Sequence, residues 1–230
     1  MQAAHPANVR CTRKKITLPN YTIGEERLNM ITHIVGAVLG LFVLLFCTVT
    51  AYRNGNTVGV VTSAIYGGSM ILLYTMSSIY HGLPRNSAKK VFRVLDHCTI
   101  YLLIAGTYTP ITLSAMVPVD LFDGLLVFFI EWGLAALAIT LTAVDMKKFN
   151  AFSMTCYVVM GWCIIAVPKI AIAAMTPMGF GLVLAGGIAY TIGAVLYGIG
   201  KKKKYIHGVF HIFVLLGSVL QFFGVYLYCI

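Results

Sequence analysis

Charged side chains are scarce in this sequence of 230 residues. Asp, Glu, Lys and Arg make up 10% of the chain, whereas 59% of the residues are hydrophobic. A soluble domain carries about a quarter charged residues, so this chain has too few to cover a surface that faces water. The composition excludes a separate soluble domain and predicts a single membrane domain.

Acidic residues are the rarest of the charged group. Seven Asp and Glu stand against 17 Lys and Arg, which gives a net charge of +10. The basic residues lie at the ends of apolar stretches, where they face anionic lipid headgroups rather than a nucleic acid. We therefore expect membrane lipids as the surroundings and no nucleic-acid partner.

Two sequence patterns are also missing. The six cysteines form no CxxC pair and lie mostly inside apolar runs, which is typical of small buried thiols. The first 28 residues contain no apolar core, so we expect no cleavable signal peptide. Residues 1–28 are predicted to be a short basic cytoplasmic tail, and the first span to be the uncleaved targeting signal.

Long apolar segments are what the sequence has instead. A membrane span needs about 20 mostly apolar residues, and seven segments approach or exceed this length. We expect residues 29–230 to form an all-α bundle of seven transmembrane helices, with kinks at Pro110 and Pro168 and a polar joint at Lys169–Pro177. The segments lie near 29–51, 58–80, 95–115, 122–143, 151–168, 178–199 and 206–228.

The distribution of basic residues predicts the orientation of this bundle. With the N-terminus in the cytoplasm and the C-terminus outside, all of the 17 Lys and Arg except Arg53 and Lys169 fall on the cytoplasmic side. Cytoplasmic loops are enriched in Lys and Arg in membrane proteins. We therefore expect a multi-pass protein of the cell membrane, the inner or plasma membrane of a bacterium.

The same topology brings several polar residues to one depth. His81 ends the second span, Asp96 begins the third, and His207 and His211 begin the seventh, all on the cytoplasmic side. His207 and His211 are four residues apart, so they share one helix face and can bind one ion. Ser77 lies one turn before His81. A lone His at a helix end is usually an interfacial residue, but three His and one Asp at one depth favour a metal site.

Three neutral imidazoles would leave a tetrahedral zinc ion with one open position, as in catalytic sites. Zinc lowers the pKa of a bound water to about 7, and Asp96 could hold or deprotonate that water. Three His with one carboxylate suit zinc better than magnesium or calcium. The sequence therefore predicts Zn²⁺ at His81, His207 and His211.

Four other residues have weaker claims to a function. His33 lies in the same cytoplasmic layer and could support the metal site, while His97 points about 100° away from Asp96 around the helix. Cys98 is a possible soft ligand, although packing is the favoured interpretation. Glu131 falls near the middle of the fourth span, where we favour a neutral, hydrogen-bonded acid over a proton relay or a substrate contact.

Four motifs stand in order along the chain and together carry a family resemblance. Any one of them is weak, but four in order on seven spans resemble the bacterial hemolysin III proteins, which are related to the progestin and adipoQ receptors. The resemblance runs from about Glu26 to the last helix. The motifs are Glu26-x-x-Asn29-x-x-Thr32-His33, Ser77-x-x-x-His81, Asp96 with the stretch to Gly106-Thr-Tyr-Thr-Pro110, and His207-x-x-x-His211.

The resemblance implies a seven-helix fold with a cytoplasmic N-terminus and a zinc ion near the cytoplasmic face. It assigns zinc ligation to the three histidines, the holding of the zinc-bound water to Asp96, and support of that water to Ser77. The wider group includes alkaline ceramidases, which suggests hydrolysis of lipid amides. The long cytoplasmic domain of the animal receptors has no counterpart before Glu26, so their hormone-binding role is not expected to transfer.

Four functions compete at this point. The first is a zinc-dependent hydrolase of an amide or ester bond in a lipid that enters from the inner leaflet. The second is a receptor or membrane-state sensor in which zinc only joins the second, third and seventh helices. The third is a pore-forming cytolysin, against which the uniformly apolar spans argue. The fourth is an ion or proton transporter, which lacks a path of further carboxylates beyond Glu131.

Overall fold

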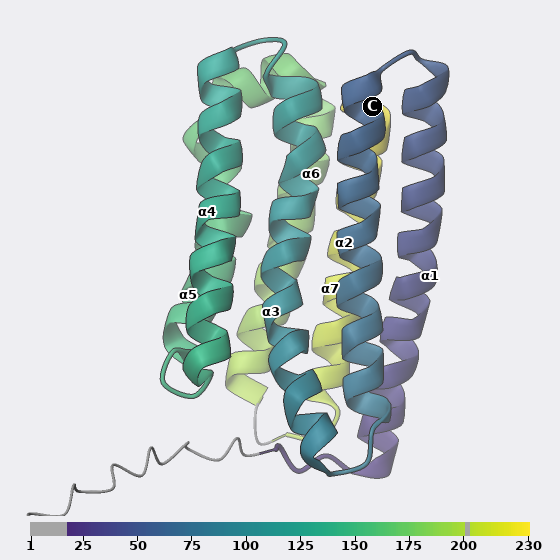
Figure 1. The fold of residues 1–230 in the computed structure, drawn as a ribbon, viewed down its shortest axis with the longest axis vertical. Coiled ribbons are helices and arrows are strands. Elements are labelled where there is room, and N and C mark those ends of the chain that lie inside the picture. Colours follow the sequence, from purple (N-terminus) through teal and green to yellow (C-terminus); the bar gives the residue numbers. More distant parts are fainter. Residues whose placement is uncertain (1–17, 201–202) are drawn as a thin grey trace, which may run out of the picture.

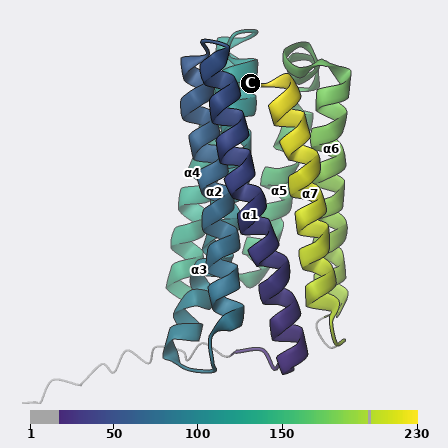
Figure 2. The ribbon, with the colours of Figure 1, turned by 90° about the vertical axis from the view of Figure 1, so that its right-hand side faces the viewer.

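The computed structural model describes residues 18–200 and 203–230, and the secondary structure of these residues is helical with no strand. The long helices run side by side in one bundle (Figures 1 and 2). The elements are α1 (Ile23–Arg53), α2 (Thr57–Gly82), α3 (Ser87–Thr109), the π-helix η1 (Pro110–Met116), α4 (Leu121–Asp145), α5 (Asn150–Gly161), the 3₁₀-helix η2 (Cys163–Ala166), α6 (Pro168–Gly200) and α7 (Ile206–Tyr228).

Within the described residues, six helices are long and apolar enough to cross a membrane: α1, α2, α3 continued by η1, α4, α6 and α7. This confirms an all-helical, multi-pass membrane architecture. The predicted segment 151–168 differs, because α5 has 12 residues and is followed by the short η2. A helix of 12 residues is about 18 Å long, less than the hydrocarbon core of about 30 Å.

The sixth helix begins earlier than the apolar pattern predicts. Pro168 does not kink a helix; it is the first residue of α6, where its missing N–H costs no hydrogen bond. The predicted joint Lys169–Pro177 is therefore helical over most of its length. The helix is broken at Met175 and Thr176, and Thr176 has a φ of +63°. Thr176 precedes Pro177, and a residue before proline disfavours the helical conformation.

The prediction of an irregularity at Pro110 is confirmed. There α3 ends and the wider η1 begins, since proline cannot donate to the preceding turn and its ring clashes with it. Side-chain hydroxyls satisfy nearby carbonyls: Thr109 donates to the Ala105 carbonyl at 2.8 Å and Thr112 to the Tyr108 carbonyl at 2.8 Å. Such substitutes allow a broken helix to exist inside a membrane.

Close packing of α1 on α2 places the residues that surround the candidate site. Gly36 lies under the Tyr74 ring and Gly40 lies against the backbone of Ile71, so a side chain at either position would push the helices apart. α1 also contacts α7. The start of α1 and the C-terminus lie at opposite ends of the bundle (Figure 1).

The cysteines of the described residues are free thiols, which confirms the prediction for these positions. Cys98, for example, is buried and its thiol donates weakly to the Ile139 carbonyl of α4 at 3.9 Å, a packing role rather than that of a ligand. Cys11 lies outside the described residues. The described thiols are Cys47, Cys98, Cys156, Cys163 and Cys229.

Candidate metal centre

Three imidazoles converge at one end of the bundle. His81 comes from the last turn of α2, and His207 and His211 come from the first two turns of α7. The Nε2 atoms of His207 and His81 are 3.3 Å apart, and those of His211 and His207 are 3.1 Å apart. A ligand atom from each of the three lies within 4.8 Å of the others. The sequence-based grouping of these three residues is thus reproduced in space.

The spacing of the three nitrogens fits a zinc ion. Ring nitrogens bonded at about 2.0–2.1 Å in tetrahedral geometry lie roughly 3.3 Å apart, close to the two Nε2 separations of 3.3 and 3.1 Å. Neutral imidazoles whose Nδ1 carries the proton direct an Nε2 lone pair into the same small volume. Lone pairs so close repel one another unless a cation lies among them.

The partners of His81 fix which nitrogen faces the centre. Its Nδ1 lies 2.7 Å from Oε2 of Glu26, and the other oxygen of Glu26 lies 2.8 Å from the ammonium of Lys89. Lys89 is 2% exposed and also donates to the Leu83 carbonyl at 2.9 Å. A carboxylate that accepts from Nδ1 leaves Nε2 as the donor atom for a metal and holds the ring in place.

His211 is held in the same way by α1. Its Nδ1 lies 3.2 Å from the Asn29 carbonyl and 3.2 Å from the hydroxyl of Thr32. Because the Thr32 hydroxyl already donates to the Asn29 carbonyl at 2.9 Å, the imidazole is the donor to that carbonyl and its Nε2 is free to bind a metal. The ring of His33 stacks on His211 with centroids 3.6 Å apart. His33 therefore packs against a candidate ligand, and its role in supporting the metal site stays a prediction.

The chain that precedes α1 covers the cluster. The ring of Tyr21 stacks on His207 with centroids 5.2 Å apart and an interplanar angle of 17°, and burial raises the pKa of this phenol. Arg85 donates to the Pro19 carbonyl at 2.6 Å. Glu25 accepts from the backbone N–H of Tyr205 at 2.8 Å and so ties the first turn of α1 to the start of α7.

Asp96 and Ser77, the two residues predicted to act on a bound water, are not part of the cluster of three histidines. Asp96 lines the same cavity as His207 and His211 but is not one of the three clustered ligands. Ser77 is fully buried, and its hydroxyl has no hydrogen-bond partner in the part of the chain that the structure describes. A catalytic role for these two residues stays a prediction.

Glu131 and His97, the other ionisable residues singled out above, are not among the three clustered ligands. The carboxylate of Glu131 is 0% exposed, and neither oxygen has a nitrogen or oxygen partner among the described residues; the thiol of Cys163, a weak donor, lies beside it. His97 lines the cavity, and its carbonyl accepts from the Tyr157 hydroxyl at 2.8 Å. The neutral, hydrogen-bonded acid predicted for Glu131 therefore stays a prediction.

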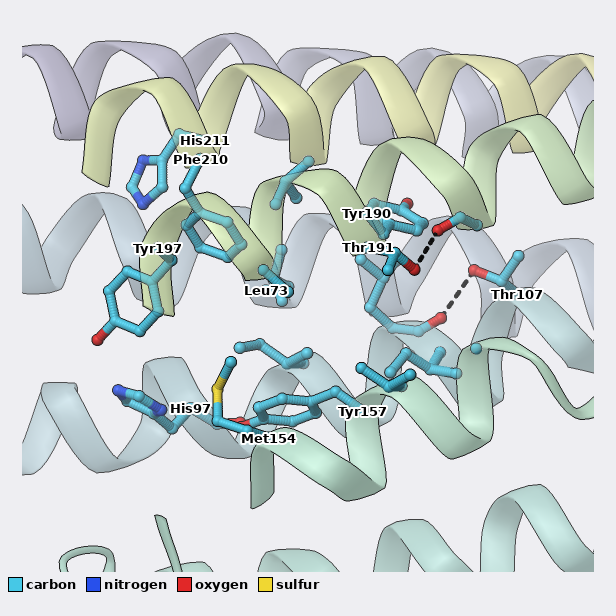
Figure 3. Close-up of a pocket in the computed structure, with 18 of the residues that line it drawn as sticks. Leu73, His97, Thr107, Met154, Tyr157, Tyr190, Thr191, Tyr197, Phe210 and His211 are labelled. Carbon is cyan, nitrogen blue, oxygen red and sulfur yellow. Dashed lines mark hydrogen bonds between the residues drawn. The ribbon is translucent and has the colours of Figure 1, made fainter. Parts of the chain in front are cut away.

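A long cavity opens from the His cluster into the bundle (Figure 3). His211, Phe210, Tyr197 and His97 lie at one end, and Tyr190, Thr191 and Thr107 at the other. The cavity has a volume of about 130 Å³. Its walls are mainly apolar and aromatic, with Leu73, Ile100, Leu103, Ile104, Met154, Tyr157, Trp162 and Val214 among them.

The sequence-based analysis assigned no role to Glu26, Asn29 or Tyr21 at this site. Glu26, Asn29 and His33 follow one another at intervals of three and four residues on an otherwise apolar helix, which places them on one face. This polar face is the feature of the sequence that could have indicated that α1 takes part in the site. Tyr21 precedes the helix, and no periodic pattern indicates that it folds back over His207.

Known proteins similar to this chain agree with its architecture. Residues 21–222 match the family model described as haemolysin-III related. The chain is 38% identical over 216 residues to hemolysin-3 of Bacillus cereus, covering 94% of this chain and 96% of the relative. It is also 38% identical over 210 residues to the hemolysin-3 homolog of Bacillus subtilis (strain 168), covering 91% and 97%.

A more distant relative comes from animals. The chain is 23% identical over 219 residues to the human monocyte to macrophage differentiation factor, covering 90% of this chain and 85% of the relative. Together with the six candidate spans, the bacterial relatives indicate that this protein is a multi-pass protein of the cell membrane.

Proposed function

Because the chain belongs to the haemolysin-III-related family, we propose that it is a zinc-dependent hydrolase of amide or ester bonds in membrane lipids. The observation that carries the proposal is the convergence of three Nε2 atoms, 3.1 and 3.3 Å apart, at the mouth of a long apolar cavity. A metal site alone would need no such cavity. A lipid substrate needs both a site for its carbonyl and room for its chain.

The proposed topology has seven crossings, with the N-terminus inside, the C-terminus outside and residues 1–28 as a cytoplasmic tail. In this topology α5, η2 and the first turns of α6 together make the fifth crossing, and the break at Met175 and Thr176 is the turn that follows it. The opposite positions of the start of α1 and the C-terminus (Figure 1) support an odd number of crossings. The cluster then lies near the cytoplasmic face, within reach of the inner leaflet.

The residues of the chain prepare the site before any substrate enters. Glu26 orients His81, and the Asn29 carbonyl orients His211, so the three Nε2 atoms require little rearrangement to bind Zn²⁺. When bound, zinc would polarise the lipid carbonyl and make water a better nucleophile at neutral pH. The apolar walls of the cavity exclude bulk water and hold the acyl chain, which positions the carbonyl at the cluster.

Asp96 is the proposed general base. Its carboxylate accepts a proton from the attacking water as the water oxygen bonds to the carbonyl carbon. The proton then passes to the leaving amine nitrogen or alcohol oxygen as the carbon–nitrogen or carbon–oxygen bond breaks. Ser77, buried one turn before His81 on α2, is proposed to support that water.

The first test is the metal content of the detergent-purified protein. Elemental mass spectrometry should find about one zinc per chain, and the double variant His207→Ala, His211→Ala should lose it. The variant His97→Ala, which changes a histidine that lines the same cavity, is the matched control and should keep the zinc. A native protein without zinc would remove the hydrolase proposal.

The second test separates binding from chemistry. Asp96→Asn should retain zinc and abolish the hydrolysis of a ceramide that carries a fluorescent acyl chain, because the amide cannot accept the proton. Turnover at the native rate would refute the role of Asp96. Native protein that contains zinc but hydrolyses neither amide nor ester lipids would favour the alternative below.

The alternative is a receptor or membrane sensor in which zinc is structural. The observation that favours it is the connection of α1, α2 and α7 around the cluster through Glu26, His81 and His211. The histidines come from α2 and α7, so the bridge would not include α3 as the sequence suggested. A chelator should then lower the melting temperature sharply, because metal binding is coupled to folding, and no lipid would be hydrolysed.

The name hemolysin-3 of the bacterial relatives refers to lysis, and a cytolytic pore is the remaining alternative. A water-filled pore needs a continuous polar lining, whereas the walls of the cavity are mainly apolar and aromatic. Conductance of reconstituted bilayers that disappears in the double His variant would be required to support it.

A further inference from the structure

One polar side chain interrupts the apolar wall far from the His cluster. Gln221 lines the same cavity as His207 and His211 and is 5% exposed. It follows His211 by ten residues on α7, which corresponds to about 15 Å along the helix axis. The cavity therefore connects the candidate metal centre with an amide that lies deep in the bundle.

Neighbouring polar groups of the cavity already have partners within the chain. Thr107 donates to the Leu103 carbonyl at 2.7 Å, and Thr191 donates to the Gly187 carbonyl at 2.8 Å (Figure 3). The hydroxyl of Tyr190 lies 2.8 Å from that of Ser218. These groups are satisfied and offer little to a ligand.

The side chain of Gln221 differs from these groups. It makes no side-chain hydrogen bond within residues 18–200 and 203–230, although its amide can both donate and accept. Its position is defined by packing, because a Cβ atom on Gly186 of α6 would lie 2.5 Å from the Gln221 Cγ. An amide that faces a mainly apolar cavity without a protein partner is costly there. A polar group on a ligand in the cavity would relieve that cost.

We propose that Gln221 recognises a hydroxyl or oxo group in the distal part of an acyl chain whose carbonyl lies at the His cluster. This inference rests on the proposed function, since it assumes that the cavity holds a lipid chain. An extended chain advances about 1.2 Å per bond, as a backbone with three bonds per 3.3–3.6 Å does. A separation of about 15 Å then corresponds to a polar group near the twelfth carbon.

The Gln221 amide is the group of the cavity wall that would distinguish substituted from unsubstituted chains. Unsubstituted chains would enter the same cavity but would leave the Gln221 amide unpaired. The substrate class that the wall favours is thus a lipid amide or ester of a mid-chain hydroxy or oxo fatty acid.

Binding of free fatty acids to the detergent-purified, full-length protein tests the proposal without requiring turnover. The three probes are octadecanoic acid, 12-hydroxyoctadecanoic acid and 2-hydroxyoctadecanoic acid, with Kd measured by titration calorimetry. One buried hydrogen bond gives an advantage of about five- to tenfold. The 12-hydroxy acid should bind more tightly by this factor than either of the other two.

The matched variant is Gln221→Met, which keeps an unbranched side chain of similar length and removes the amide. It should abolish the preference for the 12-hydroxy acid and leave the Kd of octadecanoic acid unchanged within about twofold. A series of hydroxy acids on the native protein, with the hydroxyl moved along the chain, requires no variant and should show the tightest binding near the twelfth carbon.

Equal binding of the three acids by the native protein would overturn the proposal. So would a preference that survives in Gln221→Met, a series without a maximum near the twelfth carbon, or no binding of any acid. These outcomes are separate from failure of the hydrolase proposal, which would appear as missing zinc or missing turnover in a protein that still prefers the 12-hydroxy acid.

Discussion

The His cluster and Glu131 are two ionisable regions of one apolar bundle, and their surroundings differ. His81, His211 and Glu131 are each at most 2% exposed. Nδ1 of His81 and of His211 has an oxygen partner from α1, whereas the Glu131 carboxylate has no nitrogen or oxygen partner among the described residues. Burial alone therefore does not distinguish a functional residue here; the oriented partners do.

The difference has a physical cause. A buried imidazole with one nitrogen fixed by an acceptor presents the other as a directed lone pair, which suits a cation. A carboxyl group without such partners at mid-membrane depth is best accommodated as the neutral acid. Substitutions at the histidines and their partners should therefore change metal binding strongly, and a substitution at Glu131 should change it little.

The largest effect is expected at His81, the ligand that α2 contributes. His81→Ala removes one of three ring nitrogens and should weaken zinc binding by at least about a hundredfold. Competition with a fluorescent zinc chelator on the purified protein measures this. Unchanged affinity would show that the clustered histidines are not the ligands.

The next effect concerns Glu26, which touches no metal in this scheme. Glu26→Gln weakens the acceptor on Nδ1 of His81 and removes the ion pair with Lys89. We expect zinc affinity to fall by about ten- to hundredfold, measured by the same competition. An affinity equal to that of the native protein would mean that the carboxylate does not position the ring.

A smaller effect is expected at the cover over the cluster. Tyr21→Ala removes the ring that stacks on His207, while Tyr21→Phe keeps it. Because an aromatic contact contributes about 0.5–1.5 kcal/mol, the alanine variant should release zinc to a chelator roughly two- to tenfold faster, and the phenylalanine variant at the native rate. Stopped-flow release kinetics measure this. Equal rates for all three proteins would contradict a covering role.

The smallest effect is expected at Glu131. Glu131→Gln replaces a neutral acid by an amide of the same shape, so zinc affinity should be unchanged. The melting temperature should shift by about 2 °C or less, as measured by thermal unfolding in detergent. This variant is also the matched Glu-to-Gln control for Glu26. A loss of zinc in Glu131→Gln would show that metal binding also depends on Glu131 and not on the His cluster and its partners alone.

Much of the fold could be predicted because apolar length is the dominant signal in a membrane protein. The prediction was wrong where polarity and helix geometry disagree: Lys169 and Pro177 suggested a joint, yet Pro168 at the first position starts α6 and the break comes just before Pro177. Proline is favoured in the first turn of a helix and breaks the helix in its interior, so the residue type alone does not show where a helix begins.

The grouping of the three histidines could be predicted for a similar reason. Depth in the membrane follows from topology, so His81, His207 and His211 could be grouped without a structure. Their partners could not, because Glu26 lies in the first turn of α1, and a charged residue at the end of a span is ordinary. The cover by Tyr21 depends on a turn outside any helix, and the place of Gln221 in the cavity wall depends on how α7 packs in the bundle.

The link between Glu25 and the backbone of Tyr205 has a consequence for biosynthesis. A ribosome delivers α1 and α2 first and α7 last, since synthesis proceeds from the N-terminus. Glu26 and His81 are therefore inserted into the bilayer before His207 and His211. Under the proposed function, metal loading would report that translation and insertion are complete, because a chain truncated before α7 carries a single histidine of the three.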